Sequence, residues 1–337
     1  MPAPVSGFAE ELLAWGPDVE RPSATLEEAH AYCRHLATSH YENFPVTSWI
    51  LPRRLHQPFF NIYAYCRWSD DLSDEVQDTT RSLELLAWWR QQLHDCYAGR
   101  AWHPVFVALM PTIREFQIPM DPFEDLLSAF VQDQKVHEYE TFEQLLDYCR
   151  RSANPVGRLV LYLCGKCRPE HFRWSDSICT GLQLTNFWQD VNRDLDIPRI
   201  YLPREDRARF GYRDEDLQQR ITNPAFLELM KFQVERARPY LRPWRATTGA
   251  DGTPIMADGV SAEAQDSVRS IPFRLQVVIE LFARGGLRIL DKIEAIEYRV
   301  WDQRPVLKKF DFVGLILGVL WHAASRPFRW SRRNRLK

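Results

Sequence analysis

From residue 25 onward, apolar side chains recur every three or four positions, and short stretches that contain Pro or Gly interrupt them. This spacing is typical of α-helices that bury one face. It predicts helices over residues 25–39, 52–76, 80–98, 103–116, 121–134, 141–164, 168–195, 203–210, 223–245, 271–298 and 309–323. Convincing alternation of apolar and polar residues is missing from the sequence, so we expect an all-α protein.

Three segments depart from this pattern. Residues 1–24 are rich in Pro and poorly patterned, so they are expected to be poorly structured. Residues 246–268 have the composition of a loop inserted between helices. Cutting the chain at this loop would leave the last helices without a core, so residues 25–323 are expected to form one domain, followed by a basic tail over 324–337.

The last expected helix contains an apolar run, Phe312–Trp321, with basic residues on both sides. The run is much shorter than the ~20 residues that cross a bilayer. We expect a packed terminal helix with a basic extension. Peripheral contact with the anionic inner face of the cytoplasmic membrane is the alternative.

Composition narrows the function classes. The 337 residues include 43 basic and 45 acidic ones, so bulk charge gives no reason to expect a nucleic-acid partner. Aromatic residues make up 13%, which suits either a large apolar cavity or a large core. The seven cysteines are scattered through helical patterns, as in reduced intracellular proteins. Met1–Glu20 show no export signal, so we expect a cytoplasmic protein.

Two acidic clusters lie within apolar, aromatic-rich helical patterns. The candidate metal ligands are Asp70, Asp71 and Asp74 in the first cluster, and Asn186, Asp190 and Asp194 in the second. Residues four positions apart share a helix face. If the two faces meet, they gather oxygen ligands that suit Mg²⁺ and leave positions open for a diphosphate. A solvated helix face would explain one such cluster, but two clusters accompanied by Arg favour a site.

Further side chains fit around a diphosphate, which is a good leaving group only when its developing charge is neutralised. Arg67 and Tyr63 share a helix face with Asp70, and Arg199 and Tyr201 follow the break at Pro198. The alternatives are a surface ion pair for an Arg and an ordinary core position for a Tyr.

A third segment, Tyr148–Gly157, contains Asn154-Pro155 inside a helical pattern. Proline removes a backbone donor and restricts the preceding residue, so a kink is expected here. A kink in a buried helix exposes carbonyl groups to a cavity, whereas the alternative is a plain helix break.

Together, these segments resemble the squalene/phytoene synthase family. The resemblance extends from about Ala31 to Phe310 and rests on three motifs, Tyr63–Asp74, Asn186–Asp194 and Arg199–Pro203. Within the family, the finer match is to the hydroxysqualene-forming branch of the bacterial hopanoid pathway. The segments that carry this finer match are Asn43–Arg54, Tyr148–Gly157 and Gly285–Ala295.

The resemblance implies a single-domain class I terpenoid synthase-like helical bundle around a central cavity. It implies that two or three Mg²⁺ ions bind at the acidic clusters, that Asp70, Asp74, Asp190 and Asp194 are catalytic, and that no NADPH is used. The residues it places near the substrate diphosphate are Tyr63, Arg67, Gln189, Arg193, Arg199, Tyr201 and Arg304.

The implied reaction is ionisation of presqualene diphosphate, rearrangement, and capture of the final cation by water to give hydroxysqualene. Functional coupling to the preceding and following enzymes of squalene biosynthesis is also expected. Our own hypothesis is that Ser152 or Asn154 faces the cavity and holds the quenching water, because such a water needs polar partners. Asn154 is the candidate catalytic residue of this pair.

Two other functions are compatible with the sequence. The first is head-to-head condensation of two farnesyl diphosphates to presqualene diphosphate or squalene, or of two geranylgeranyl diphosphates to phytoene. The second is a helical isoprenoid-binding protein without turnover. Clustered carboxylates without basic partners argue against the second, since they cost stability when desolvated.

Overall fold

The computed structural model describes residues 7–19, 24–39, 52–76, 78–242, 247–248, 254–255, 273–308 and 311. Its elements are α1 (Gly7–Trp15), α2 (Leu26–Ser39), η1 (Arg53–Leu55), α4 (His56–Asp74), α5 (Thr79–Tyr97), α6 (Pro104–Phe116), α7 (Asp121–Asp133), α8 (Phe142–Ser152), α9 (Asn154–Leu163), α10 (Pro169–Asp196), α11 (Arg204–Phe210), α12 (Asp214–Gln218), α13 (Pro224–Ala237), η2 (Arg238–Leu241), β1 (Thr247–Thr248), β2 (Pro254–Ile255) and α15 (Phe273–Ala295). The all-α prediction is confirmed. The two strands are a short antiparallel pair inside the expected loop 246–268.

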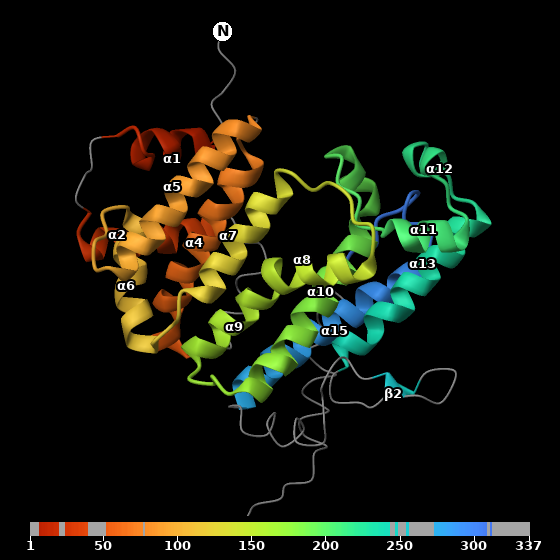
Figure 1. Ribbon diagram of the computed structural model, residues 1–337. Coiled ribbons are helices and arrows are strands. Elements are labelled where there is room, and N and C mark those ends of the chain that lie inside the picture. The colour runs from red at the N-terminus through yellow and green to blue at the C-terminus, as the bar shows by residue number, and fades with distance from the viewer. Residues whose placement is uncertain are drawn as a thin grey trace, which may run out of the picture.

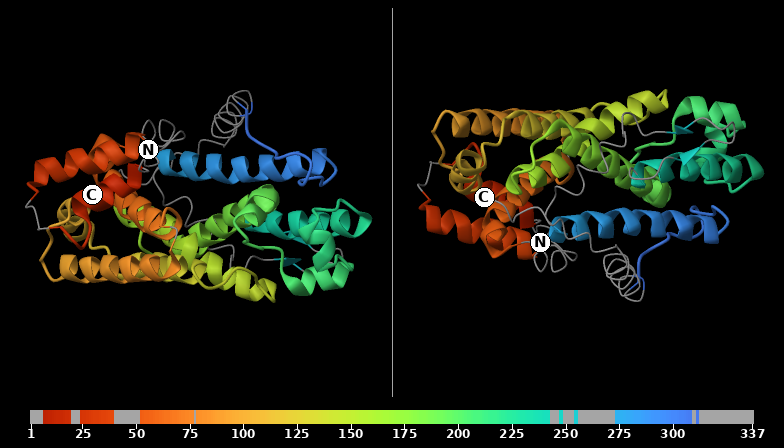
Figure 2. Two further views of the ribbon diagram at one scale, coloured as in Figure 1. Left: turned by 90° about the horizontal axis from the view of Figure 1, so that it is seen from above. Right: turned by 90° about the horizontal axis from the view of Figure 1, so that it is seen from below.

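The helices form two groups, which helices from the middle of the chain join (Figure 1). In the first group, α2 packs on α4 and α6, and α5 packs on α4. In the second group, the long helix α10 packs against α9, α13 and α15. Figure 2 shows α15 in blue along one side of this second group, next to the green α10 and α13. Helices α7, α8 and α9 pack on one another and link the two groups.

Aromatic side chains build the core of the first group. Trp68 and Trp89 are both buried and stack with ring centroids 5.1 Å apart. The buried His103 lies edge-on to both rings. Much of the aromatic content noted in the sequence therefore stabilises this core, because large rings bury a large apolar area.

Two expected boundaries are corrected by the positions of prolines. The expected helix 141–164 is two helices, α8 and α9, because Pro155 lacks the N–H group that would bond the carbonyl of Arg151. The expected helix 223–245 ends as α13 at Ala237 and continues only as η2, where Pro239 lacks the same donor.

The expectation of a poorly structured N-terminal segment is wrong for α1. Phe8, Leu12 and Trp15 lie on one face of this helix and pack against the first core. The short helix α12 was not expected either. Apart from Asp311, the expected helix 309–323 and the tail 324–337 lie outside the described residues.

None of the helices in the described part of the chain is long and apolar enough to cross a membrane. The described cysteines are free thiols. Two of them, Cys164 and Cys167, form a Cys-x-x-Cys sequence in the turn between α9 and α10.

Candidate functional site

A cavity of about 280 Å³ lies where α4, α7, α8 and α10 approach one another. Its acidic side chains come from α4, α7 and α10, and its basic side chain comes from the segment that follows α10. Its apolar wall comes from α7 and α10. The lining residues are Asp70, Asp74, Ala129, Phe130, Asp133, Tyr148, Ser152, Gln183, Asn186, Phe187, Asp194, Arg199 and Tyr201.

Both acidic clusters reach this cavity. Asp70 and Asp74 come from the last turn of α4, one helical turn apart, and Asn186 and Asp194 come from the C-terminal half of α10. Helical spacing puts the members of each pair on the same side of their helix. The fold then turns the two helices so that these sides line one space.

Two of the expected metal ligands lie elsewhere. Asp71 accepts a hydrogen bond from Nε of Arg67 at 3.0 Å, and Asp190 accepts one from Nη2 of Arg304 at 3.0 Å. Neither carboxylate lines the cavity. In this structure an arginine pairs with each of these two carboxylates, Arg67 on the same helix with Asp71 and Arg304 from a distant segment with Asp190. Their role as metal ligands stays a prediction.

Arg199 connects the two acidic clusters. Its Nη2 donates to Oδ1 of Asp74 at 2.9 Å, although the two residues lie 125 positions apart in the chain. Burial alone would lower the pKa of Arg199, but the carboxylates of Asp74 and Asp133 raise it instead. The guanidinium is thus a fixed positive charge among the acids.

Burial raises the pKa values of two acids that line the cavity, Asp194 and Asp70. Burial and the neighbouring Asp190 raise the pKa of Asp194 to about 7. Burial and the neighbouring Asp74 raise the pKa of Asp70 to about 6. One carboxylate oxygen of Asp194, Oδ2, is buried without a hydrogen-bond partner among the described residues. These carboxyl groups are therefore held in surroundings that disfavour their charge unless a cation is close.

Sequence reasoning missed Asp133. This carboxyl on α7 lines the cavity and accepts a hydrogen bond from the hydroxyl of Tyr148 at 2.9 Å. Burial raises its pKa to about 7. In the sequence, Asp133 is the last residue of a helix that carries three other acids, Asp121, Glu124 and Asp125, so the pattern did not single it out. Gln183, one turn before Phe187 on α10, was missed for a similar reason.

Few of the expected substrate-binding residues line the cavity. Tyr201 lines it and stacks on Phe187 with centroids 3.9 Å apart. Gln189 donates to the carbonyl of Pro305, which ties the segment that carries Arg304 to α10. Arg193 is exposed on α10, and Tyr63 packs against the first core. Of this set, only Arg199 and Tyr201 line the cavity.

Asn154 does not line the cavity either. It is buried, and its Oδ1 accepts a hydrogen bond from the Thr180 hydroxyl at 2.9 Å, which joins α9 to α10. The cavity is reached by Ser152, at the last position of α8. Of our two candidates for holding a water, the structure therefore places only Ser152 at the site.

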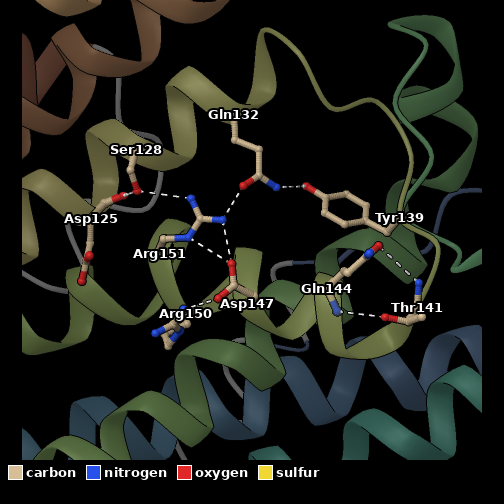
Figure 3. A network of polar contacts seen from close by, with 9 residues as sticks. All are labelled: Asp125, Ser128, Gln132, Tyr139, Thr141, Gln144, Asp147, Arg150 and Arg151. Atoms are coloured by element: carbon tan, nitrogen blue, oxygen red, sulfur yellow. Dashed lines mark hydrogen bonds and ion pairs between the residues drawn. The ribbon is translucent and has the colours of Figure 1, made fainter.

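A polar network fixes α8 against α7 beside the cavity (Figure 3). Arg151 donates to Oγ of Ser128 at 3.3 Å, to Asp147 and to Gln132. Gln132 in turn donates to the hydroxyl of Tyr139 at 3.3 Å. At the other end of α8, Thr141 and Gln144 form a capping box. The helix that carries Tyr148 and Ser152 is thus held at both ends.

No three His, Cys, Asp or Glu side chains gather closely enough within the described residues to hold a metal ion on their own. The cavity nevertheless offers only oxygen donors of the kind that hard cations bind, and one of them is the unpartnered Oδ2 of Asp194. The donor set therefore fits Mg²⁺ in chemistry.

The raised pKa of Asp194 predicts how stability depends on pH. Between its ordinary pKa of about 3.9 and its folded value of about 7, the folded protein binds more protons than the unfolded chain does. The free energy of unfolding should therefore fall as the pH rises through this window. Without divalent cations, the wild-type melting temperature should drop more between pH 5 and pH 8 than that of Asp194→Asn, measured by circular dichroism. Equal drops in the two proteins would contradict the assignment.

The fold and the cavity together define a class I terpenoid synthase-like helical domain. The chain belongs to the squalene/phytoene synthase family, since the model of that family matches residues 37–311. The family consists of isoprenoid synthases that bind isoprenoid diphosphates, so both the predicted family and the general class of enzyme are confirmed.

Individual relatives include more than one activity. The chain is 30% identical over 305 residues to a phytoene synthase of Arthrospira platensis, covering 86% of this chain and 92% of the relative. It is 31% identical over 283 residues to a hydroxysqualene synthase of Rhodopseudomonas palustris, covering 83% and 88%. The crystal structure of squalene synthase HpnC from Alicyclobacillus acidocaldarius superposes with a TM-score of 0.71 at 37% identity, covering 81% of this chain and 95% of that one.

Proposed function

We propose that the chain converts presqualene diphosphate to hydroxysqualene in a Mg²⁺-dependent reaction that releases diphosphate. The observation that carries this proposal is one cavity lined by acids from both α4 and α10, with Arg199 between them. The similarity to a hydroxysqualene synthase and to HpnC supports this choice of substrate within the family.

In this proposal, Asp70, Asp74, Asn186 and Asp194 hold Mg²⁺. When bound, Mg²⁺ supplies Lewis-acid neutralisation of the charge that develops on the departing diphosphate. Since no three protein acids gather around one point in the described structure, diphosphate oxygens and water would complete the coordination. Asp71 and Asp190 would take part only after their arginine partners had moved.

The chain itself contributes charge and an apolar wall. Arg199 presents a permanent positive charge to the leaving group, which stabilises the transition state of ionisation. Phe130, Phe187 and Tyr201 line the cavity with aromatic rings. Ring faces attract cations, so these rings would stabilise the carbocation while their bulk keeps bulk water away. No NADPH-dependent step is included.

Head-to-head condensation is the second candidate function. The observation that favours it is the 30% identity to a phytoene synthase over most of both chains. The same charge-neutralising cavity would ionise farnesyl or geranylgeranyl diphosphate, because the chemistry of the leaving group is identical.

One set of incubations distinguishes the two reactions. Purified chain is supplied with Mg²⁺, without NADPH, and with presqualene, farnesyl or geranylgeranyl diphosphate in separate tubes, and the extracted lipid is identified by mass spectrometry. Alcohol formed from presqualene diphosphate is the expected result. Consumption of farnesyl or geranylgeranyl diphosphate without conversion of presqualene diphosphate would replace the proposal by condensation.

A further inference from the structure

Ser152 is a polar residue in a cavity whose lining also includes Ala129, Phe130 and Phe187. It stands at the last position of α8. Its Oγ is buried and has no hydrogen-bond partner among the described residues. A buried hydroxyl without a partner is unfavourable, so a polar group that enters the cavity beside it gains by bonding it.

The direction of Ser152 is fixed by its neighbour. Arg151 is anchored on α7 through Ser128 and Gln132, as Figure 3 shows. Consecutive residues of a helix point about 100° apart, so holding Arg151 on α7 also holds Ser152 toward the cavity. Tyr148 lies one helical turn earlier and lines the same cavity.

Ser152 follows Tyr148 by one helical turn on α8, and Tyr148 is the residue that bonds Asp133. On α10, Gln183 precedes Asn186 and lines the same cavity. A water needs two to four polar partners to be held in such surroundings. Beyond its acids and Arg199, the lining also carries the Asn186 amide, which is proposed to hold Mg²⁺, and two tyrosine hydroxyls, of which that of Tyr148 bonds Asp133. The Ser152 hydroxyl and the Gln183 amide are the polar groups of the lining that the proposed function leaves without a role.

We propose that Ser152, together with Gln183, holds the water that captures the carbocation, so that Ser152 is the positioning residue that selects an alcohol as product. This inference rests on the proposed function. An oxygen lone pair of the water forms the new C–O bond, and the water's proton passes to the diphosphate released in the same turnover. Without a held water, the cation loses a proton from carbon to the same acceptor and becomes a hydrocarbon.

The test is the ratio of alcohol to hydrocarbon formed from presqualene diphosphate, Mg²⁺ and ¹⁸O-labelled water, read by mass spectrometry. Wild-type protein should give labelled alcohol, and Ser152→Ala should lower the ratio about tenfold while diphosphate release continues. Ser152→Thr, which keeps the hydroxyl, should restore most of the alcohol. Ser152→Ala removes no hydrogen bond within the described protein, so it should fold as well as wild type.

Ser177→Ala is the matched control, because this α10 serine bonds the carbonyl of Tyr240 and does not line the cavity. Its product ratio should equal that of wild type. An unchanged ratio in Ser152→Ala, with wild type forming labelled alcohol, would overturn the role of Ser152 alone. Absence of alcohol from wild type would overturn the proposed function together with this inference.

Discussion

Replacing Asp194 by asparagine is expected to lower kcat/KM by about a thousandfold. Asp194 lines the cavity from α10, and its buried Oδ2 has no hydrogen-bond partner among the described residues. Asparagine keeps the shape of the side chain but removes the negative charge that the proposed Mg²⁺ requires. Steady-state release of diphosphate from presqualene diphosphate measures the effect.

The control for this variant is Asp196→Asn. Asp196 lies two residues further along α10, is exposed and pairs with Arg220 outside the cavity. It should keep kcat/KM within about twofold. Asp194→Asn should also stay folded at neutral pH, because it removes a carboxyl whose charge is disfavoured by burial. Near-normal activity in Asp194→Asn would contradict the assigned role.

Replacing Arg199 by glutamine is expected to lower kcat/KM by about a hundredfold. The change removes the fixed positive charge that reaches Asp74 across the cavity. Arg199 also lowers the pKa values of Asp70, Asp133 and Asp194, although burial raises all three overall. Its loss should therefore move the acidic limb of the pH–rate profile to higher pH, a shift that a purely structural role would not produce.

Arg204→Gln serves as the control for charge removal near this loop. Arg204 is exposed, pairs with Glu138 and Glu140, and does not line the cavity. Its kcat/KM should change by no more than about twofold, and its pH–rate profile should stay in place. If Arg199→Gln and Arg204→Gln behave alike, the charge of Arg199 has no special function.

Local patterns in the sequence predicted most of the helices and one part of the site, but not α1, α12 or the break between α8 and α9. The four-residue spacing of Asp70 and Asp74 set their shared helix face without any knowledge of the fold. The break at Pro198 predicted that Arg199 and Tyr201 leave α10 in a loop, and both line the cavity. The motifs around these residues also sufficed to predict the family.

Tertiary contacts decided the parts that the sequence could not predict. Asp190 has the same spacing to Asp194 as Asp70 has to Asp74, yet Arg304 from a distant segment pairs with it. Asp133 reaches the cavity only because α7 packs on α4 and α8. Asn154 bonds Thr180 on α10 and does not face the cavity, a contact that the local sequence does not indicate. Such pairings depend on how helices are arranged, which helical periodicity does not encode.

The most direct measurement of the central claim is the location of Mn²⁺ in crystals of the full chain soaked with a non-hydrolysable analogue of presqualene diphosphate. Anomalous scattering should place the ions in the cavity, with protein ligands from Asp70 or Asp74 on α4 and from Asn186 or Asp194 on α10. Ions that contact only one of these helices, or that lie outside the cavity, would contradict a site shared between them.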